Sequence, residues 1–191
     1  MIQLIAFLGN YGKEYEATRH NVAWLFEDSL VFSNRLSWSQ KYKSEFVCCD
    51  YTDVVNWLCD ASLLKRRSDG SLPVPEDSPK KLYFMKPLTY MNLSGDAISE
   101  AARFYKIPPE DILIVHDEIE LPLGTVSLKW SGGLGAHNGL RSAKAQLGTA
   151  DFWRLRFGVG KPANGNVADY VLGRFTEDER IALSQVFSVS G

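Results

Sequence analysis

The sequence predicts an α/β fold, a single domain built on a mixed, mostly parallel sheet that helices cover on both faces. Short strands that are apolar on both faces, such as Ile112 to Val115, alternate with segments whose apolar residues recur at helical spacing. A chain of 191 residues suits one ordinary domain, which we assign to residues 1–191. The composition, 45% hydrophobic and 23% charged, is typical of a globular protein with a sizeable core and argues against disorder and fibrous repeats.

The first half of the chain opens with a strand, a polar loop and a helix. The apolar run Ile2 to Leu8 predicts a buried strand, and apolar residues at helical spacing from Val22 to Leu30 predict the helix. We interpret Phe46 to Tyr51 and Val54 to Cys59 as two further strands. The polar stretch Asp60 to Lys81 contains three prolines and predicts a long exposed loop at residues 60–81.

The second half of the chain alternates strands and helices. Strands are predicted, in chain order, at Leu82 to Met85, Ile112 to Val115, Val126 to Trp130 and Arg154 to Val159. Helices are predicted over Ala97 to Tyr105, Leu140 to Leu147 and Ile181 to Phe187. Thr176 and Glu179 have the spacing of a capping box, which marks the start of the last helix.

Charge and cysteine content exclude several classes of protein. The net charge of -2 excludes a generally basic nucleic-acid coat. Between Gly124 and Lys161, however, six basic residues oppose one acidic residue, which predicts either a basic surface for an anionic partner or, with equal weight, two solvated faces. Three cysteines without dense spacing favour a reducing cytoplasm over a disulfide framework, and neither a signal peptide nor a membrane span is expected.

Polar side chains gather in loops that follow four of the predicted strands. These loops are Gly9 to Asn21, Thr89 to Asn92, His116 to Glu118 and Gly132 to Gly139. Functional groups of α/β sheets collect beyond the carboxyl ends of strands, so these loops are the candidate site. His20, just before a helix, and Asp117, at a strand end, are placed like a general base and its orienting carboxylate. The alternative is an ordinary surface or core histidine and an aspartate that caps a turn.

Other chemistries have weaker support in the sequence. Gly9 to Lys13 lacks the spacer and the hydroxyl residue of a P-loop, and the glycines after Trp130 are too widely spaced for a dinucleotide loop. The three histidines and the Cys48–Cys49 pair have no zinc-type spacing, so neither a metal nor a cofactor is predicted. The cysteines lie in or beside apolar strands, which favours packing over nucleophilic catalysis.

Six segments, taken together and in this order, resemble the bacterial-type peptidyl-tRNA hydrolases. They are Gly9 to Gly12 with the nearby Tyr15, Thr18 to Asn21, Lys86 to Gly95, His116 to Gly124, Gly135 to Leu140 and Arg154 to Gly160. The resemblance implies hydrolysis of the ester that joins a peptide to the ribose of a tRNA's terminal adenosine, which returns the tRNA to translation in ribosome rescue. It implies peptidyl-tRNA as the partner of a cytoplasmic monomer that needs no cofactor and no membrane.

The resemblance also implies roles for single residues. His20 would be the general base that activates water, and Asp117 would be its partner. Asn10 and Asn92 would hold the substrate through their amides, which can donate hydrogen bonds to a developing oxyanion. The other residues implied in substrate or tRNA binding are Tyr15, Met91, Asn138, Lys129 and Arg156, the last two as contacts to tRNA phosphate. An ester has a better leaving group than an amide, so a water activated by an imidazole suffices without metal.

The chain also departs from the family's usual pattern. Tyr11 stands where the family usually has proline, and Leu134 and Ala136 stand in a loop where glycine or polar residues are common. The loop at residues 60–81 is longer than usual, and the final helix is expected to be short. None of these departures removes a proposed catalytic group.

Two functions of other classes remain as alternatives. The same fold family includes RNA-splicing relatives thought not to be hydrolases, and such a binding module would keep the basic face while its His-Asp-Asn set drifted. The complete set here favours the enzyme. A cofactor-binding α/β protein is the third interpretation, and it depends only on the glycine-rich loop after Trp130.

Overall fold

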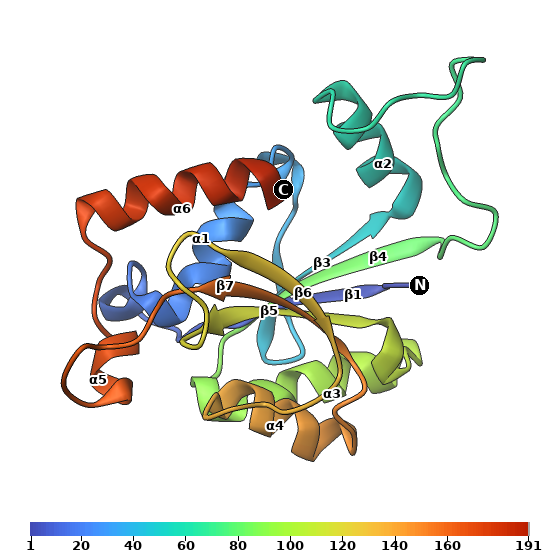
Figure 1. The fold of residues 1–191 in the computed structure, drawn as a ribbon. Helices are drawn as coiled ribbons and strands as arrows, with labels where there is room; N and C mark the ends of the chain where they lie inside the picture. The colour runs from blue at the N-terminus through green and yellow to red at the C-terminus, as the bar shows by residue number, and fades with distance from the viewer. Residues whose placement is uncertain (191) are drawn as a thin grey trace.

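The computed structural model describes residues 1–190, and within them one seven-stranded sheet runs through the molecule in the order β2-β3-β4-β1-β5-β7-β6 (Figure 1). The strands are β1 Leu4–Phe7, β2 Ser39–Lys41, β3 Ser44–Asp50, β4 Lys81–Pro87, β5 Ile112–Glu118, β6 Val126–Trp130 and β7 Trp153–Gly158. Strands β4, β1, β5 and β7 are parallel, whereas β2, β3 and β6 join antiparallel at the edges. The predicted α/β fold with a mixed sheet is confirmed.

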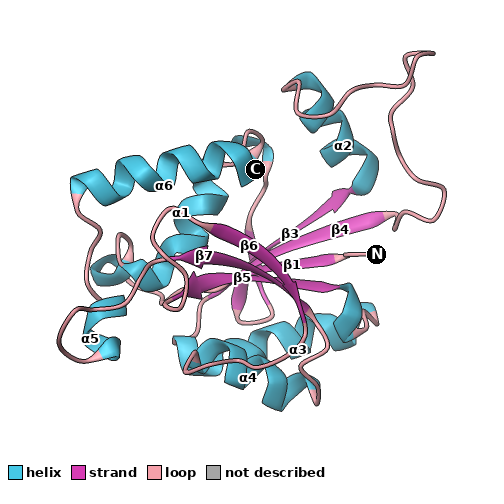
Figure 2. Ribbon diagram, in the orientation of Figure 1, coloured by secondary structure: helices cyan, strands magenta, loops and turns pink. Residues whose placement is uncertain are grey.

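Helices cover each face of the sheet, and each face has its own apolar core (Figure 2). The helices are α1 Val22–Ser29, α2 Tyr51–Asp60, α3 Ser94–Tyr105, α4 Asn138–Leu147, α5 Val167–Val171 and α6 Glu177–Ser190. On one face Ile98 of α3 and Leu140 of α4 share a core with Ile114 of β5. On the other face Phe26 of α1 packs against Phe7 of β1. Among residues 1–190 no helix combines the length and apolar character that a bilayer crossing needs.

One predicted strand is wrong. Val54 to Cys59 belongs to helix α2, whose buried residues are Val54 and Val55. The two consecutive β-branched residues Val54 and Val55 favoured a strand. Leu58, however, lies four residues after Val54 and three after Val55, which is helical spacing, and it packs on the same core as Val54. Asp53 in the first turn also suits the positive end of the helix dipole. Burial of a helical stripe therefore overrides β-propensity here, because propensity is a weak preference.

Strand β5 is longer than its apolar run predicts. We expected the strand to end at Val115 and His116 to Glu118 to form a loop, but β5 continues through Glu118. Its last residues pair with β7, with Asp117 opposite Phe157 in the parallel register. Strand β7 supplies hydrogen-bond partners for the backbone of these polar residues. A search for apolar runs cannot detect such pairing. Asp117 consequently projects from a rigid strand and not from a loop.

The predicted capping box forms at the start of α6. The backbone N–H of Thr176 donates to Oε2 of Glu179 at 2.7 Å, and the N–H of Glu179 donates to Oγ1 of Thr176 at 3.3 Å. This reciprocal pair fixes where the chain turns into the helix. The short elements β2 and α5 were not predicted. Strand β2 consists of three polar residues and helix α5 of five residues of mixed polarity, and neither is long enough to show a periodicity.

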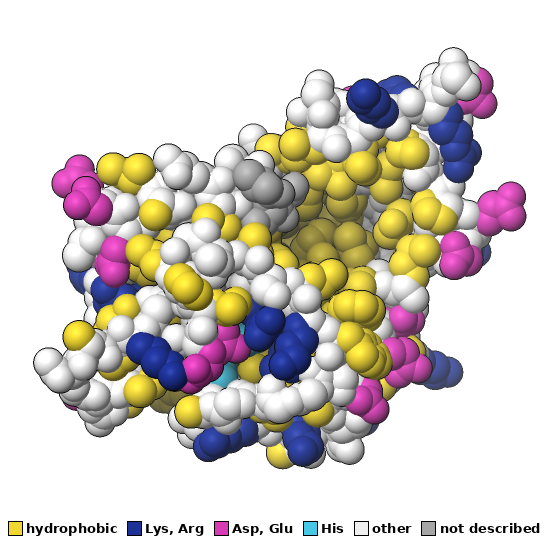
Figure 3. Space-filling view, viewed as in Figure 1, with side chains coloured by type: hydrophobic (Ala, Val, Ile, Leu, Met, Phe, Trp, Pro, Cys, Tyr) yellow, Lys and Arg dark blue, Asp and Glu magenta, His cyan; other side chains and the backbone are white. Residues whose placement is uncertain are grey.

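The segment between α2 and β4 is largely irregular, as the polar stretch at residues 60–81 predicts. In Figure 1 this segment and α2 lie beyond the end of β3 and the start of β4. Figure 3 shows a hollow of apolar side chains between α2 and the end of α6. The candidate site lies elsewhere, beyond the carboxyl ends of the central parallel strands.

Candidate active site

A cavity of about 510 Å³ lies beyond the carboxyl ends of β1, β4 and β5. Six of the residues singled out from the sequence line it: His20, Asp117, Asn10, Asn92, Met91 and Asn138. They come from segments far apart in the chain, which the parallel strands bring to one edge of the sheet. Tyr15, Lys129 and Arg156 do not line the cavity.

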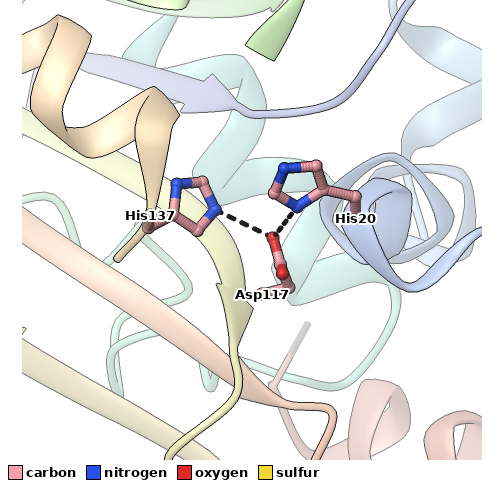
Figure 4. A group of neighbouring side chains, drawn as sticks. All are labelled: His20, Asp117 and His137. Atoms are coloured by element: carbon pink, nitrogen blue, oxygen red, sulfur yellow. Dashed lines mark hydrogen bonds and ion pairs between the residues drawn. The ribbon is translucent and has the colours of Figure 1, made fainter. Parts of the chain in front are cut away.

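Two imidazoles share one carboxylate oxygen at the floor of the cavity. Oδ1 of Asp117 lies 2.8 Å from Nδ1 of His20 and 2.8 Å from Nε2 of His137 (Figure 4). The Asp117 side chain is 2% exposed, whereas those of His20 and His137 are 13% and 9% exposed. The carboxylate is therefore enclosed, and the rings separate it from solvent.

Hydrogen bonding fixes the tautomers of both rings. Nδ1 of His137 accepts the backbone N–H of Leu140, the first-turn amide of α4, so the ring proton of His137 sits on Nε2. That Nε2–H donates to Asp117. A carboxylate has no proton to donate, so Nδ1 of His20 must also carry a hydrogen. This leaves Nε2 of His20 free to accept a proton in the cavity.

Asp117 is held ionised. Burial by itself raises the pKa of the Asp117 carboxyl, but the electrostatic attraction and the hydrogen bonds of the neighbouring His20 and His137 rings outweigh it and keep that pKa well below its ordinary range. A permanently ionised acceptor suits a base partner, because it stabilises the imidazolium that forms when His20 takes a proton.

A third histidine lies behind this network. His116 is 1% exposed, and its Nδ1 donates to the backbone carbonyl of Asp117 at 2.6 Å. Its ring meets the ring of His137 edge-on, with centroids 4.9 Å apart. Burial, followed by the effect of His137, lowers the pKa of His116 to about 3. His116 is therefore neutral and packs as part of the wall behind His137.

The side chain of Asn10 is oriented by its neighbours. Its Oδ1 accepts the N–H of Met91 at 2.8 Å, and its backbone N–H donates to Oδ1 of Asn21 at 2.8 Å. Asn21 donates back to the carbonyl of Asn10 at 2.9 Å. With Oδ1 occupied, Nδ2 is the group that Asn10 presents to the cavity as a donor.

Asn92, Asn138 and Met91 also line the same cavity. Asn92 and Asn138 are exposed, whereas Met91 is 4% exposed and belongs to the core below. Gly139 allows this packing, because a Cβ there would lie 2.6 Å from Sδ of Met91 and 3.1 Å from Cε1 of His137. A side chain at residue 139 would therefore push Met91 or His137 out of place.

Part of the cavity lining is apolar. This part comes from helix α5 and the residue after it, and from the loops after β5 and β6: Val167, Ala168, Val171, Leu172, Ile119 and Leu134. The same cavity is also lined by the amides of Asn10 and Asn92 and by the imidazole of His20. The cavity thus combines an apolar surface with a small set of polar groups, as ligand sites commonly do.

The segment from Gly124 to Lys161, which we call the basic segment, exposes fewer unpaired cations than its count of basic residues predicts. Arg154 is 1% exposed and donates to the carbonyls of Gly133 and Ser131, which anchors the glycine-rich loop. Arg156 donates to Ser127 at 2.9 Å and lies 3.7 Å from a carboxylate oxygen of Glu118. In Figure 3 basic and acidic side chains adjoin on this side of the molecule.

Besides the buried Arg154, three cations of the segment have no acidic partner within residues 1–190: Lys129, Arg141 and Lys144. Lys161, by contrast, pairs with Glu120 at 2.7 Å. The sequence count missed this neutralisation because Glu118 and Glu120 lie before the segment in the chain. Tyr15 is half-buried in a 3₁₀ turn at Lys13–Tyr15, where its carbonyl accepts the hydroxyl of Thr18.

Within the described chain, the group that could ligate a metal is His20, Asp117 and His137, whose ligand atoms lie within 4.8 Å of one another. Both nitrogens that face Asp117 carry hydrogens in the present arrangement. A cation would therefore have to displace two N–H donors that already satisfy the carboxylate. The hydrogen-bonded network accounts for the three side chains as they stand.

The sequence did not assign roles to His137 and Asn21. His137 lies in the matching segment Gly135 to Leu140, and Asn21 follows His20 directly, so both lay within segments already singled out. Spacing alone could not reveal that His137 reaches Asp117, because the two lie 20 residues apart on different elements. The signal that could have found it is a histidine at a helix start after a glycine-rich loop.

Comparison with known proteins identifies relatives along the whole chain. A family model described as "Peptidyl-tRNA hydrolase" matches residues 4–190. The chain is 45% identical to a peptidyl-tRNA hydrolase of Treponema pallidum over 187 residues, which is 97% of this chain and 81% of that protein. It is 40% identical to one of Oleidesulfovibrio alaskensis over 192 residues, 96% of this chain and 83% of that protein. The crystal structure of the Acinetobacter baumannii peptidyl-tRNA hydrolase superimposes with a TM-score of 0.78 at 29% identity, covering 98% of this chain and 83% of that one.

Proposed function

The chain belongs to the family of peptidyl-tRNA hydrolases, hydrolases of the ester bond of peptidyl-tRNA, and on that premise we propose that His20 is the general base of the reaction and Asp117 orients it. The observation that carries this proposal is the shared Oδ1 of Asp117, 2.8 Å from both imidazoles. Because Asp117 engages Nδ1 of His20, Nε2 is the ring nitrogen left for the reaction, in a cavity that also contains amide donors.

The reaction then follows from the groups in the cavity. Nε2 of His20 takes a proton from a water molecule while the water oxygen attacks the carbonyl carbon of the ester. The tetrahedral oxyanion accepts hydrogen bonds from Nδ2 of Asn10 and from the amide of Asn92. The bond between the carbonyl carbon and the ribose oxygen breaks, and His20 returns the proton to that oxygen. The products are a free peptide carboxyl and a free tRNA.

His137 supports the same step without exchanging protons with the substrate. Its Nε2–H gives Asp117 a second donor, and its Nδ1 is occupied by the N–H of Leu140. Asp117 therefore keeps one geometry, and His20 keeps one tautomer. Met91 and Asn138 contact the end of the tRNA or the peptide from the rim of the cavity.

The tRNA body is bound outside the cavity. Lys129 and Arg156 lie on the neighbouring strands β6 and β7 and contact tRNA phosphate. Tyr15 also contacts the tRNA. We further propose that the protein acts as a monomer in the cytoplasm, where its role in translation is to release tRNA from peptides. An ester at the end of a tRNA needs a cavity for the ester and cations for the phosphates, and the position of Lys129 and Arg156 outside the cavity supports this proposal.

The test is release of N-acetyl-amino acid from N-acetyl-aminoacyl-tRNA by the purified protein. Wild type is expected to release the N-acetyl-amino acid with free tRNA as the second product, and His20→Ala is expected to release almost none. Tight tRNA binding with no ester cleavage by the wild type would instead favour an RNA-binding module. Cleavage by His20→Ala at the wild-type rate would exclude His20 as the base.

A further inference from the structure

Arg19 precedes His20 in the chain, yet its side chain is buried under the segment that joins α5 to α6. It is 8% exposed. Its Nη2 donates to both carboxylate oxygens of Glu179, at 3.0 and 2.9 Å, and its Nη1 donates to the carbonyl of Arg174 at 3.1 Å. The guanidinium also lies 4.3 Å from the ring centre of Tyr170. Arg19 thus joins the 3₁₀ turn that carries the proposed base to the segment between α5 and α6 and to the first turn of α6.

Backbone contacts join the same two segments. The N–H of Arg19 donates to the carbonyl of Gly173 at 3.0 Å, and the N–H of Phe175 donates to the carbonyl of Ala17 at 3.3 Å. These bonds place the end of α5 beside the turn before His20. The side chain of Arg19 then fixes how closely they approach, because it lies between α5 and the start of α6.

Helix α5 forms part of the apolar side of the cavity, through Val167, Ala168, Val171 and Leu172 just after it. We call these four residues the α5 wall. The helix has five residues, far fewer than an isolated helix needs for stability, so its place depends on contacts to other elements. One such contact is the hydroxyl of Tyr170, which donates to the carbonyl of Val159 at 2.7 Å. The other is the stack and hydrogen bonding with Arg19.

We propose that Arg19 and Glu179 are positioning residues, which hold the α5 wall at a fixed distance from His20 and thereby determine how tightly the cavity holds its substrate. The inference deepens the proposed function and rests on it. Neither side chain lines the cavity, so the pair acts through α5 and not on the ester. Its effect therefore falls on substrate binding and leaves the chemical step unchanged.

The chemistry of the pair makes it hard to replace. Nη2 of Arg19 donates to both carboxylate oxygens of Glu179 while Nη1 donates to backbone carbonyls, and lysine cannot reproduce this planar set of donors. Burial also means that loss of the carboxylate leaves a charged guanidinium without its partner. The hydrogen bonds and charge of Arg19 and the Thr176 contacts lower the pKa of Glu179 against the opposing effect of burial, so the pair is charged at neutral pH.

The experiment uses Glu179→Gln, which keeps the size of the side chain and an oxygen for the capping box with Thr176. On N-acetyl-aminoacyl-tRNA we expect KM to rise about fivefold or more, with kcat within about twofold of wild type and an unchanged pH profile. Tyr170→Phe, which removes the other anchor of α5, is expected to raise KM in the same direction. Glu100→Gln removes an exposed ion pair with Lys43 and serves as the matched control with no change in KM.

Amide hydrogen exchange tests the pair without relying on hydrolysis. Without substrate, the amides of residues 168–172 are expected to exchange faster in Glu179→Gln than in wild type, while those of β5 remain unchanged. A variant with lower thermal stability but wild-type KM and wild-type exchange in α5 would overturn the proposal and leave the pair a structural contact. A fall in kcat at constant KM would also overturn it. If wild type cleaves no ester, the proposed function fails, while the exchange data still decide whether the pair holds α5.

Discussion

The floor of the cavity and the basic segment organise charged groups in opposite ways. At the floor, Asp117 is 2% exposed, and both donors that reach it come from rings carried by other elements. In the basic segment, Arg154 is buried in a structural role, Arg156 is shared with Glu118, and Lys129 has no acidic partner among residues 1–190. The floor acts as one network, whereas the segment is a set of separate cations.

This difference determines how each region responds to mutation. In a closed network the loss of one member leaves a buried group unsatisfied, so effects are large and not additive. Cations at a surface interact with phosphate through solvent and salt, so each contributes a modest and separable amount. The predictions below test this contrast from its largest expected effect to its smallest.

The largest effect is expected for His20→Ala. Loss of a general base typically costs about 10²–10⁴-fold in rate, and the residue does not position the tRNA body. Single-turnover cleavage of N-acetyl-aminoacyl-tRNA measures the loss, and a tRNA-binding titration serves as the control. Retention of more than about a tenth of wild-type turnover would be too much activity for an enzyme without its only base.

Asp117→Asn is expected to lose on the order of 10–10²-fold in kcat, less than His20→Ala. The neutral amide is a weaker acceptor for the two N–H donors and no longer stabilises an imidazolium. His137→Gln, which can still donate to Asp117, is expected to lose less than Asp117→Asn. The same kinetic assay ranks the three variants, and a silent Asp117→Asn would show that the pairing has no catalytic role.

In the basic segment, Lys129→Ala is expected to have a larger effect than Arg156→Ala, because Glu118 and Ser127 already engage the Arg156 guanidinium. Removing a cation that neutralises one phosphate should make the plot of the logarithm of the tRNA association constant against the logarithm of salt concentration less steep, by roughly 0.7 to 0.9 in slope. KM for full-length substrate should rise, while cleavage of a peptide esterified to adenosine should barely change. Equal losses of activity on both substrates would show that Lys129 and Arg156 support the fold and do not bind phosphate.

A separate prediction concerns stability and pH rather than catalysis or tRNA binding. The pKa of His116 falls from an ordinary value of about 6.5 to about 3 in the folded protein, so between these values the unfolded chain binds more protons. The contribution of this group to folding stability is present above about pH 6.5 and is lost as the pH falls toward 3. Denaturant unfolding of His116→Asn should show a shallower pH dependence than wild type, and an identical dependence would contradict the assignment.

The sequence predicted the fold class, most strands and six of the residues that line the cavity, because each depends on local pattern or on a known family resemblance. It failed at Val54 to Cys59, where two β-branched residues concealed a helical stripe that only packing reveals. It also ended β5 too early, since the pairing partner of Asp117 lies on β7.

What the sequence could not supply in the site is contact between distant elements. His137 reaches Asp117, and Arg19 reaches Glu179, across 20 and 160 residues. The composition of the basic segment likewise could not show that Arg154 is buried or that acids before the segment neutralise part of it. Charge counts describe the chain, whereas binding depends on which charges remain unpaired at the surface.

The central claim is that Asp117 holds both imidazoles as N–H donors and leaves Nε2 of His20 as the free base. Nitrogen-15 NMR of the imidazole nitrogens at neutral pH measures this directly, with His20→Ala and His137→Gln used to assign the signals. We expect His20 to be protonated at Nδ1 and unprotonated at Nε2, and His137 to be protonated at Nε2 and unprotonated at Nδ1. A proton on Nε2 of His20 with Nδ1 bare would contradict the account, because the ring could then neither donate to Asp117 nor take a proton from water.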